Sequence, residues 1–491
     1  MAASFKSDDS FLRKLVVGAA GTNATIDRLT ALGFRPIELE RGSTGFKIWK
    51  KIKIKRVRVP DILCLRTGLR FESRGKTKPE ISMSHSLSET RRAWDAGMRD
   101  DDFISIVVFH QSAESPIDLK PISPVQFIKV KDLRDAFGGN RVSITKPKGV
   151  EEGSEIRVVW MSAVAAQPSI VSEISEKRIQ LKDNESGRIQ TVQLVRNKGT
   201  ITLEPQVCVG DTVEANRIVA ASVPVSVALS CPPPVDEAYF VDKLGNTNLS
   251  ERYAAAKALR YRGYTTARRA LADRMALPDE DIYVQLEAAA ALAAHGHPEG
   301  WGFMEGKLRS DVMHVPLETQ LETVIVVSEI PDPSSESLLI EVLKDEGRDD
   351  ELRAGAAWAL GQFATPAAAN ALVATFNSAE LGVKTEAARS LLKITGKQVD
   401  PVVELLKTCM PDQRDGLSWA LARSGGFDPN ILFDGADDNL RRWISYILGH
   451  GKNLFSTRDV EAVCTSDPQV YFAASVLWQI LESWIDGLTE V

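Results

Sequence analysis

The sequence predicts a multidomain fold in which an α/β region comes first, a small β-rich region follows, and an all-α solenoid forms the C-terminal half. Three patterns predict it: a helix, strands, helix, strand order near the start, short β-branched runs between turn residues in the middle, and then a repeat of about thirty residues. The chain has 491 residues, of which 44% are hydrophobic, so it is long enough for about three domains. We expect these domains at residues 1–150, 151–230 and 235–491.

The C-terminal half repeats. Similar helical segments recur, as in Gln285–Leu292 and Arg353–Leu360, with small alanines where helices must approach closely. The final apolar positions of successive segments are spaced by 33, 34, 34, 31, 30, 27 and 29 residues: Leu259, Leu292, Val326, Leu360, Leu391, Leu421, Leu448 and Leu477. A period near thirty with two helices per period is typical of an α-solenoid, and it resembles short HEAT repeats. The apolar stripes are predicted to form the core, and they include Trp358, Trp419 and Trp443.

Residues 151–230 predict an antiparallel β region. Short β-branched or alternating runs such as Val158–Trp160 and Thr191–Val195 are separated by Asn, Gly and Asp turns. The stretch Gly199–Val213 resembles the barrel-sandwich hairpin of biotinyl and lipoyl carriers, which implies a small β-barrel-like domain. Its turn has no lysine to carry a prosthetic group, so we expect a spacer. The proline-rich stretch Cys231–Pro234 predicts a stiff linker into the solenoid.

The first 110 residues predict an α/β order of elements. The expected helices and strands are Ser10–Ala20, Thr22 or Asn23 to Leu32, Arg35–Glu40, Phe46–Lys50, Arg56–Leu65, Gly68–Lys76, Glu89–Gly97 and Phe103–Phe109. Within this order stand Pro60 and Asp61, followed by Glu72, Arg74 and Lys76. The order and these residues resemble the PD-(D/E)XK nuclease superfamily, which implies a restriction-endonuclease-like N-terminal domain.

The resemblance implies a metal site. By analogy, Asp61 and Glu72 hold Mg²⁺ (or Mn²⁺), which lowers the pKa of a bound water and neutralises charge on the scissile phosphate. Members of the superfamily often place a further acid on the first helix. Asp27 is the candidate for that metal ligand here, and Glu38 or Glu40 on the following strand competes with it.

The catalytic lysine of the superfamily has no direct match. Arg74 occupies its position, and arginine stays protonated, so it can clamp a phosphate but is a poor proton acceptor. Lys76 lies on the same strand face, about 7 Å further along, and can take the role. Because side chains alternate along a strand, Glu72 shares that face. The alternative is that both carboxylates make ordinary cross-strand ion pairs with Arg58 or Arg70.

The net charge of −6 conceals a split between a basic and an acidic part. Residues 1–150 contain 28 Lys+Arg and 17 Asp+Glu, or +11, which leaves 32 and 49, or −17, for residues 151–491. A basic surface attracts phosphate backbones, so nucleic acid, with DNA favoured, should bind the first third, and a protein should bind the acidic solenoid. A basic run supplies the predicted nucleic-acid-binding residues: Lys47, Lys50, Lys51, Lys53, Lys55, Arg56 and Arg58. The alternative is a solvated basic strand at a sheet edge.

The leading hypothesis from the sequence is a Mg²⁺-dependent nucleic-acid phosphodiesterase with a protein-binding repeat array, an architecture that suits bacterial genome defence, including antiviral defence, or DNA processing. The competing hypothesis is a non-catalytic nucleic-acid-binding adaptor, or a scaffold that uses the solenoid for protein assembly, and Arg74 favours it. The chain has no run of eighteen apolar residues, and Met1–Ser10 is polar, so we expect neither a membrane span nor secretion. Five well-separated cysteines predict the reducing cytoplasm.

Overall fold

The structure is a computed structural model that describes residues 9–40, 57–110, 119–146, 155–196, 201–309, 315–378 and 380–489. These residues fall into two compact units, one up to Val284 and one from Gln285. The first unit combines β-sheets with helices, and the second is all helical. Within the described ranges, no helix is both long enough and apolar enough to span a membrane.

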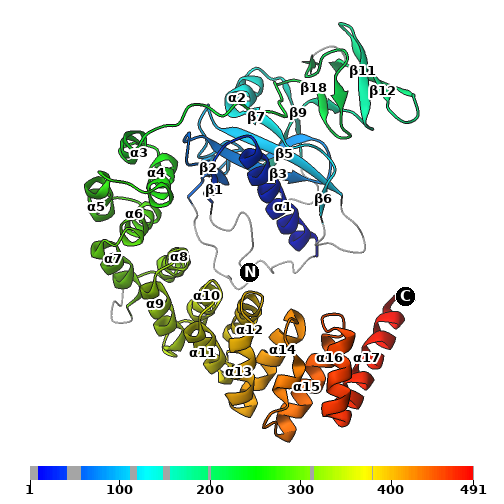
Figure 1. Cartoon of the computed structure of the whole chain (residues 1–491). Coiled ribbons are helices and arrows are strands. Elements are labelled where there is room, and N and C mark those ends of the chain that lie inside the picture. The colour runs from blue at the N-terminus through cyan, green and yellow to red at the C-terminus, as the bar shows by residue number, and fades with distance from the viewer. Residues whose placement is uncertain are drawn as a thin grey trace. The chain divides into compact units, whose positions relative to one another are not determined.

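The first unit is built on a mixed sheet that α1 (Asp9–Ala31) covers on one face (Figure 1). The sheet has the order β1-β2-β3-β5-β6, with β7 also paired to β5. Its strands are β1 (Pro36–Glu38), β2 (Ile62–Cys64), β3 (Arg70–Lys76), β5 (Phe103–His110), β6 (Lys120–Pro121) and β7 (Gln126–Lys129). The first three strands form an antiparallel meander, and β5 runs parallel to β3. The first helix, the other strands and the final strand are therefore present in the predicted order, whereas the strand predicted at Phe46–Lys50 lies outside the described residues.

Close contact between α1 and β3 explains why α1 is one continuous helix, although the sequence predicts two. A Cβ atom on Gly21 would lie 2.6 Å from the backbone nitrogen of Gly75, so only glycine allows this approach. One turn further along α1, the Thr25 hydroxyl is 2.9 Å from the Ser105 hydroxyl and 3.3 Å from that of Ser73. The glycine that marks a helix break in the sequence is thus a contact point inside the helix.

The other face of this sheet packs against a second sheet of β4 (Ile81–Ser86), β9 (Glu155–Trp160) and β8 (Val142–Thr145), and against α2 (Val130–Gly138). Ile104 and Ile106 of β5 share this core with Trp94 and Trp160, whose rings meet edge to face. The helix predicted at Glu89–Gly97 is only a 3₁₀ turn, Thr90–Arg92, followed by further tight turns. We attribute this to the burial of Trp94, because the turns direct that ring into the core where an exposed helix would not.

The sequence predicts a small β-barrel-like domain here, and the described strands of the β-rich region do not close into a barrel. Its described strands form three separate sheets, β10-β18-β16, β13-β12-β11-β17 and β14-β15, and no ladder among the described residues joins them. The strands are β10 (Ser162–Val164), β11 (Ser169–Ile174), β12 (Arg178–Asp183), β13 (Ile189–Gln193), β14 (Val195–Arg196), β15 (Ile201–Thr202), β16 (Glu204–Pro205), β17 (Thr212–Val213) and β18 (Ile218–Ala221). Several of these strands have only two residues, too few to carry the continuous ladder that closure requires.

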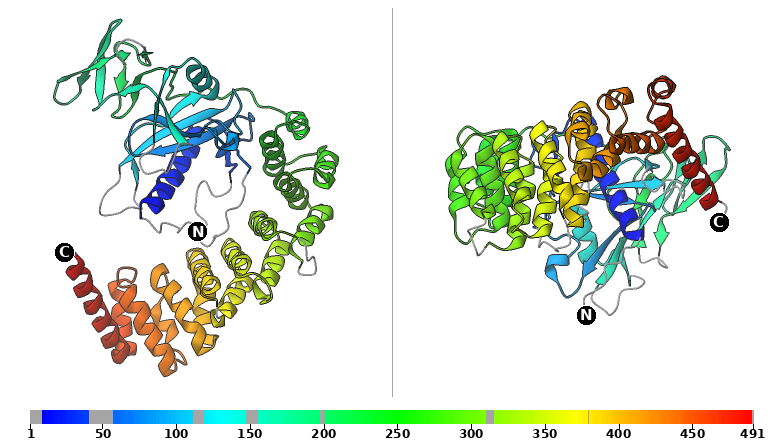
Figure 2. Two further views of the ribbon diagram at one scale, coloured as in Figure 1. Left: turned by 180° about the vertical axis from the view of Figure 1, so that it is seen from behind. Right: turned by 90° about the horizontal axis from the view of Figure 1, so that it is seen from below.

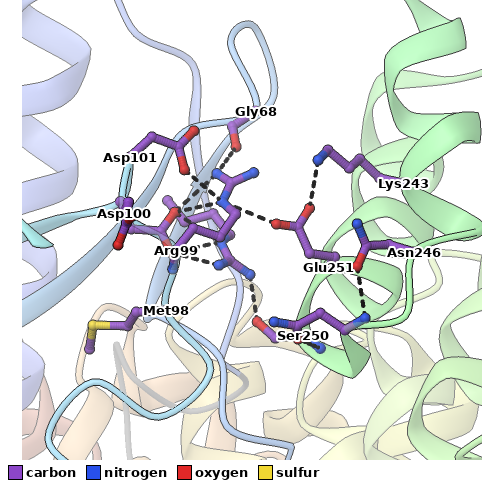
Figure 3. A network of polar contacts seen from close by, with 12 residues as sticks. Gly68, Met98, Arg99, Asp100, Asp101, Lys243, Asn246, Ser250 and Glu251 are labelled. Carbon is purple, nitrogen blue, oxygen red and sulfur yellow. Dashed lines mark hydrogen bonds and ion pairs between the residues drawn. The ribbon is translucent and has the colours of Figure 1, made fainter. Parts of the chain in front are cut away.

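A buried polar network connects the sheet to the first helices of the chain's helical part, α3 (Glu237–Leu244) and α4 (Leu249–Arg262), which precede α5 (Arg268–Ala276). At its centre, Asp102 is completely buried and accepts hydrogen bonds from both Arg70 and Arg99, with the closest Arg70 contact at 2.6 Å. Arg70 also donates to the Ser250 hydroxyl. Arg99 lies 3.3 Å from Glu251 (Figure 3). The two arginines therefore bind one carboxylate of the sheet and two side chains of α4.

The second unit is a stack of helices in two rows, which Figures 1 and 2 show from opposite sides. Helices α8, α10, α12, α14, α15 and α17 contact one another in succession and form the inner row. The helices from α6 onwards are α6 (Ile282–Ala294), α7 (Pro298–Leu308), α8 (Leu317–Ser328), α9 (Pro333–Lys344), α10 (Asp350–Leu360), α11 (Pro366–Ala374), α12 (Leu381–Thr395), α13 (Asp400–Thr408), α14 (Arg414–Ser424), α15 (Asp438–His450), α16 (Thr457–Ser466) and α17 (Pro468–Thr489).

The predicted repeat is confirmed. The eight apolar positions from Leu259 to Leu477 fall on α4, α6, α8, α10, α12, α14, α15 and α17 in turn, and all are buried except Leu477, which is half-buried. Helix starts follow from the sequence as well. The Asp332 and Thr365 side chains accept from backbone N–H groups of α9 and α11, and a proline follows each, where its missing N–H costs nothing.

We predict that Asp102→Asn destabilises the first unit by about 3–5 kcal/mol, because it leaves the buried Arg70 guanidinium without a counter-charge. Hydrogen exchange of the β3 and α4 amides measures this loss locally. Asp101→Asn is the matched control. Asp101 also contacts Arg99, but its side chain is 54% exposed, so its removal should cost less than about 1 kcal/mol. Equal effects of the two substitutions would contradict the assignment.

Candidate functional site

Two carboxylates of the α/β region lie side by side. Glu72 is on the face of β3 that points away from α1, and Asp61 immediately precedes β2. The backbone N–H of Ser73 donates to the Asp61 carboxylate at 2.7 Å. The Asp61 side chain thus serves as the acceptor for this N–H of β3.

The electrostatics of this pair favour protonation or an added cation. Burial raises the pKa of Asp61 well above its ordinary value, and the nearby carboxylates of Glu72 and Glu40 raise it further. Burial also raises the pKa of Glu72, although Arg74 beside it partly offsets the effect. Of the two acids predicted to compete with Asp27, Glu40 is therefore the one close enough to act on the pair.

The cations of β3 have separate partners. Arg74 forms an ion pair with Glu72 at 2.7 Å, and Arg70 is paired with Asp102. The Lys76 ammonium donates to the Ser82 carbonyl at 2.7 Å. Burial, together with the positive charges of Arg74 and Arg157, lowers the pKa of Lys76 from 10.5 to about 8. At neutral pH a fraction of Lys76 is therefore able to accept a proton.

The remaining predicted residues do not join this pair. Asp27 is exposed on α1, which packs on the opposite face of β3. Arg58 is exposed and lies close enough to lower the pKa of Glu72. Six of the seven predicted nucleic-acid-binding cations, between residues 47 and 56, lie outside the described residues. Across the described ranges, no group of three or more His, Cys, Asp or Glu side chains is arranged to hold a metal ion.

A second candidate site lies on the inner row of helices α12, α14 and α15. It is an open groove of about 460 Å³, which we call the aromatic groove. Its apolar lining consists of Leu381, Ala388, Trp419, Trp443 and Tyr446, and its charged lining of Lys384, Arg389 and Asp415. The sequence predicts Trp419 and Trp443 to be core residues, but both are only half-buried and face the groove.

Two tryptophans of this row each have a cation over the ring. The Arg423 guanidinium lies 4.4 Å from the Trp419 ring centre, and the Lys393 ammonium lies 5.5 Å from that of Trp358. Within the groove, Lys384 is 2.8 Å from Asp415. The signal that sequence reasoning missed is the spacing of Trp419 and Arg423, four residues apart on one helix, which lets a cation stack on an indole that is exposed on one side.

Comparison with known proteins identifies the repeats. Residues 316–392 and 336–424 match the family model of HEAT repeats. The C-terminal solenoid therefore contains HEAT repeats. The matched segment includes α12 and α14, which form most of the aromatic groove. The search of curated proteins finds no match.

Solved structures resemble the chain at low identity. Human deoxyhypusine hydroxylase in complex with glycerol is 17% identical, with a TM-score of 0.23, and the match covers 43% of this chain and 83% of the enzyme. The CpcE and CpcF complex of the phycocyanin lyase from Nostoc is 17% identical, with a TM-score of 0.25 and coverage of 50% and 96%. An engineered protein is 20% identical, with a TM-score of 0.23 and coverage of 47% and 72%.

We predict that Lys76 titrates near pH 8, which NMR of the chain with ¹³C-methylated lysines measures directly. Lys76→Arg identifies the signal by removing it. Arg74→Gln should raise the pKa of Lys76, since the positive charge of Arg74 helps to lower it. Because the folded pKa lies below the unfolded one, the charged form is disfavoured in the folded state, and stability should rise with pH between about 8 and 10.5. A Lys76 signal that titrates near 10.5 would contradict this environment.

Proposed function

We propose that the chain is a protein-binding adaptor whose HEAT repeats hold a segment of a partner protein in the aromatic groove. The observation that carries the proposal is the half-buried pair Trp419 and Trp443 at an open groove of about 460 Å³. Pockets of roughly 300–1,000 Å³ accept whole ligands or several side chains. Tryptophan and arginine dominate the binding energy of protein interfaces, and repeat arrays present such residues on a continuous surface.

The fold removes the Trp419 and Trp443 side chains from water only in part, which supports a role in binding. Neighbouring positions on the same helices, such as Leu417, Leu421 and Ile444, are fully buried and account for the packing between helices. Trp419 and Trp443 instead keep part of each ring exposed, although tryptophan is among the residues that gain most from leaving water. An exposed aromatic pair of this kind is typical of an interaction site.

The polar network of the first unit fits an adaptor with two working parts. Arg70 and Arg99 hold α4 against the sheet that contains Asp61 and Glu72. The first helices of the solenoid are thereby fixed to the α/β region by buried ion pairs. An adaptor of this design presents the α/β region and the HEAT repeats as parts of one chain, with a folded connection between the sheet and the first helix pair.

Panning of a phage-displayed random peptide library against the full chain tests this function. We expect enriched peptides that bind the wild type and lose binding to the Trp419→Ala/Trp443→Ala variant, because that variant removes the aromatic lining. Phe472→Ala is the control, since Phe472 is a 70% exposed aromatic residue on α17 outside the groove. Circular dichroism melting verifies that each variant is folded. Absence of enriched peptides, or equal binding by the double variant, would contradict the function.

A second candidate function is the metal-dependent phosphodiesterase that the sequence resemblance implies. The adjacent carboxylates Asp61 and Glu72, with raised pKa values, and the neighbouring Lys76, with a lowered one, support it. The ion pair between Glu72 and Arg74 speaks against it, because the arginine already supplies the positive charge that a metal would bring. For this reason we place the adaptor first.

The donor set fits Mg²⁺ in one respect. Mg²⁺ retains several waters and binds through one or two carboxylates, which Asp61 and Glu72 can provide. A bound cation would polarise a phosphate and lower the pKa of a coordinated water. The residues of the chain would contribute in two ways: Arg74 would contact the phosphate, and neutral Lys76 would accept a proton. The basic run at residues 47–58 is the proposed nucleic-acid contact.

Cleavage assays with Mg²⁺ or Mn²⁺ test this candidate on single- and double-stranded DNA and RNA. If the site is catalytic, Asp61→Asn and Glu72→Gln should each reduce cleavage by about 10³-fold or more, since both ligands are needed to hold the metal. Lys76→Gln should lose activity most strongly above pH 8, where the wild-type lysine is neutral. Asp95→Asn, which alters a carboxylate paired with Arg134 instead, should retain activity. Wild-type protein that cleaves none of the four substrates would exclude this function and leave the adaptor unaffected.

A further inference from the structure

We propose that the aromatic groove binds an acidic segment of its partner, in which a large apolar side chain stands beside carboxylates. This inference rests on the proposed adaptor function and adds the chemistry of the partner. It follows from two properties of the groove that the fold does not require: cations gather at a groove on an acidic array, and aromatic rings form its walls.

The charge of the groove contrasts with that of the surrounding array. Residues 285–491 contain 16 Lys+Arg and 31 Asp+Glu, a net charge of −15. Helix α12 reverses this balance, with Lys384, Arg389 and Lys393 against one acid, Glu386, whose side chain is only 6% exposed. An acidic ligand is therefore repelled by the net charge of the array and attracted by the cations that α12 places at the groove. Such a contrast in charge mainly determines where a charged segment docks, and it contributes less to the affinity.

The cations of the groove remain available to a ligand. The Lys384 and Arg389 side chains are 31% and 43% exposed, and their partners are Asp415 and Glu386. An ion pair at the surface contributes at most about 1 kcal/mol, so a ligand carboxylate can share or replace it. Arg423, stacked on Trp419, has a guanidinium edge that can donate to a further carboxylate.

The apolar lining calls for a large side chain between those carboxylates. The rings of Trp443 and Tyr446 meet edge to face with centres 5.6 Å apart, and they form one wall. Leu381, whose side chain is 77% exposed, stands at the same groove. A tryptophan, phenylalanine or leucine of the ligand would bury these exposed apolar surfaces. Single-stranded nucleic acid also combines negative charge with flat rings, but a long polyanion would extend beyond the groove over the array, whose net charge of −15 repels it.

Fluorescence anisotropy with the full chain tests the proposal. The probe is a fluorescein-labelled peptide, Glu-Asp-Trp-Leu-Glu-Asp, and its comparison probes are Lys-Arg-Trp-Leu-Lys-Arg, Glu-Asp-Ala-Ala-Glu-Asp and an oligothymidylate. We expect the first peptide to bind at least about tenfold more tightly than each of the others, and its affinity to fall as salt rises. Tighter binding of the basic peptide, or of the oligothymidylate, overturns the proposal.

Variants locate the binding. Lys384→Gln/Arg389→Gln should weaken the binding of the acidic peptide by about tenfold. The fold should stay intact, because both side chains are partly exposed. Lys407→Gln/Arg458→Gln, on α13 and α16, makes the same change of charge outside the groove and should have no effect. Equal affinity of the two double variants overturns the proposal.

The library selection described above separates this inference from the function on which it rests. If selected peptides depend on Trp419 and Trp443 but are neutral or basic, the adaptor function stands and the acidic-segment inference fails. If no selected peptide depends on these residues, both fail. If the peptides are groove-dependent and acidic, with an aromatic or leucine residue among the acids, both are supported.

Discussion

The buried carboxylate of Asp102 is the constraint on which much of the first unit depends. A charge without access to water is tolerated only where partners surround it, and here the partners are Arg70 at the start of β3 and Arg99 in the loop before β5. Both arginines also reach α4, through Ser250 and Glu251. The same interaction thus fixes the position of α4 against the starts of β3 and β5.

The two faces of β3 differ: one packs against α1, and the other carries the charged side chains. The Gly75 face is closed, because α1 approaches so tightly that a Cβ on Gly75 would lie 2.1 Å from the Val17 carbonyl oxygen. Charged side chains can therefore stand only on the other face, where Arg70, Glu72, Arg74 and Lys76 follow one another. Arg70 is committed to the structural network, and Arg74 neutralises Glu72. Arg74 thus supplies one positive charge to the carboxylate pair, a charge that an ion would bring at a metal centre, while the pKa of Asp61 stays raised.

The sequence predicts the elements that rest on periodicity and leaves unpredicted those that depend on contacts between distant residues. The spacing of Leu259, Leu292 and their equivalents locates the inner-row helices, because each helix pair buries one apolar stripe in a repeated way. The strand meander and the position of Glu72 follow from alternation. The sequence around Gly21 does not indicate that this glycine lies within a helix. Glycine is needed there because of a contact with Gly75, more than fifty positions away. The partial exposure of Trp419 cannot be predicted from the sequence either, because core positions and groove positions follow the same helical period.

The two candidate sites make different demands on electrostatics, and this difference favours binding as the common theme. A catalytic metal site needs carboxylates that are free of competing cations, whereas Glu72 has Arg74 at 2.7 Å. A docking groove needs cations held close to apolar surface but not buried, and Lys384, Arg389 and Arg423 meet this description beside Trp419 and Trp443. The net negative charge of the array then acts as a filter, because it repels acidic chains away from the groove that α12, α14 and α15 form. Specificity in such an arrangement arises from the contrast between the groove and its surroundings, so it depends on residues that never touch the ligand.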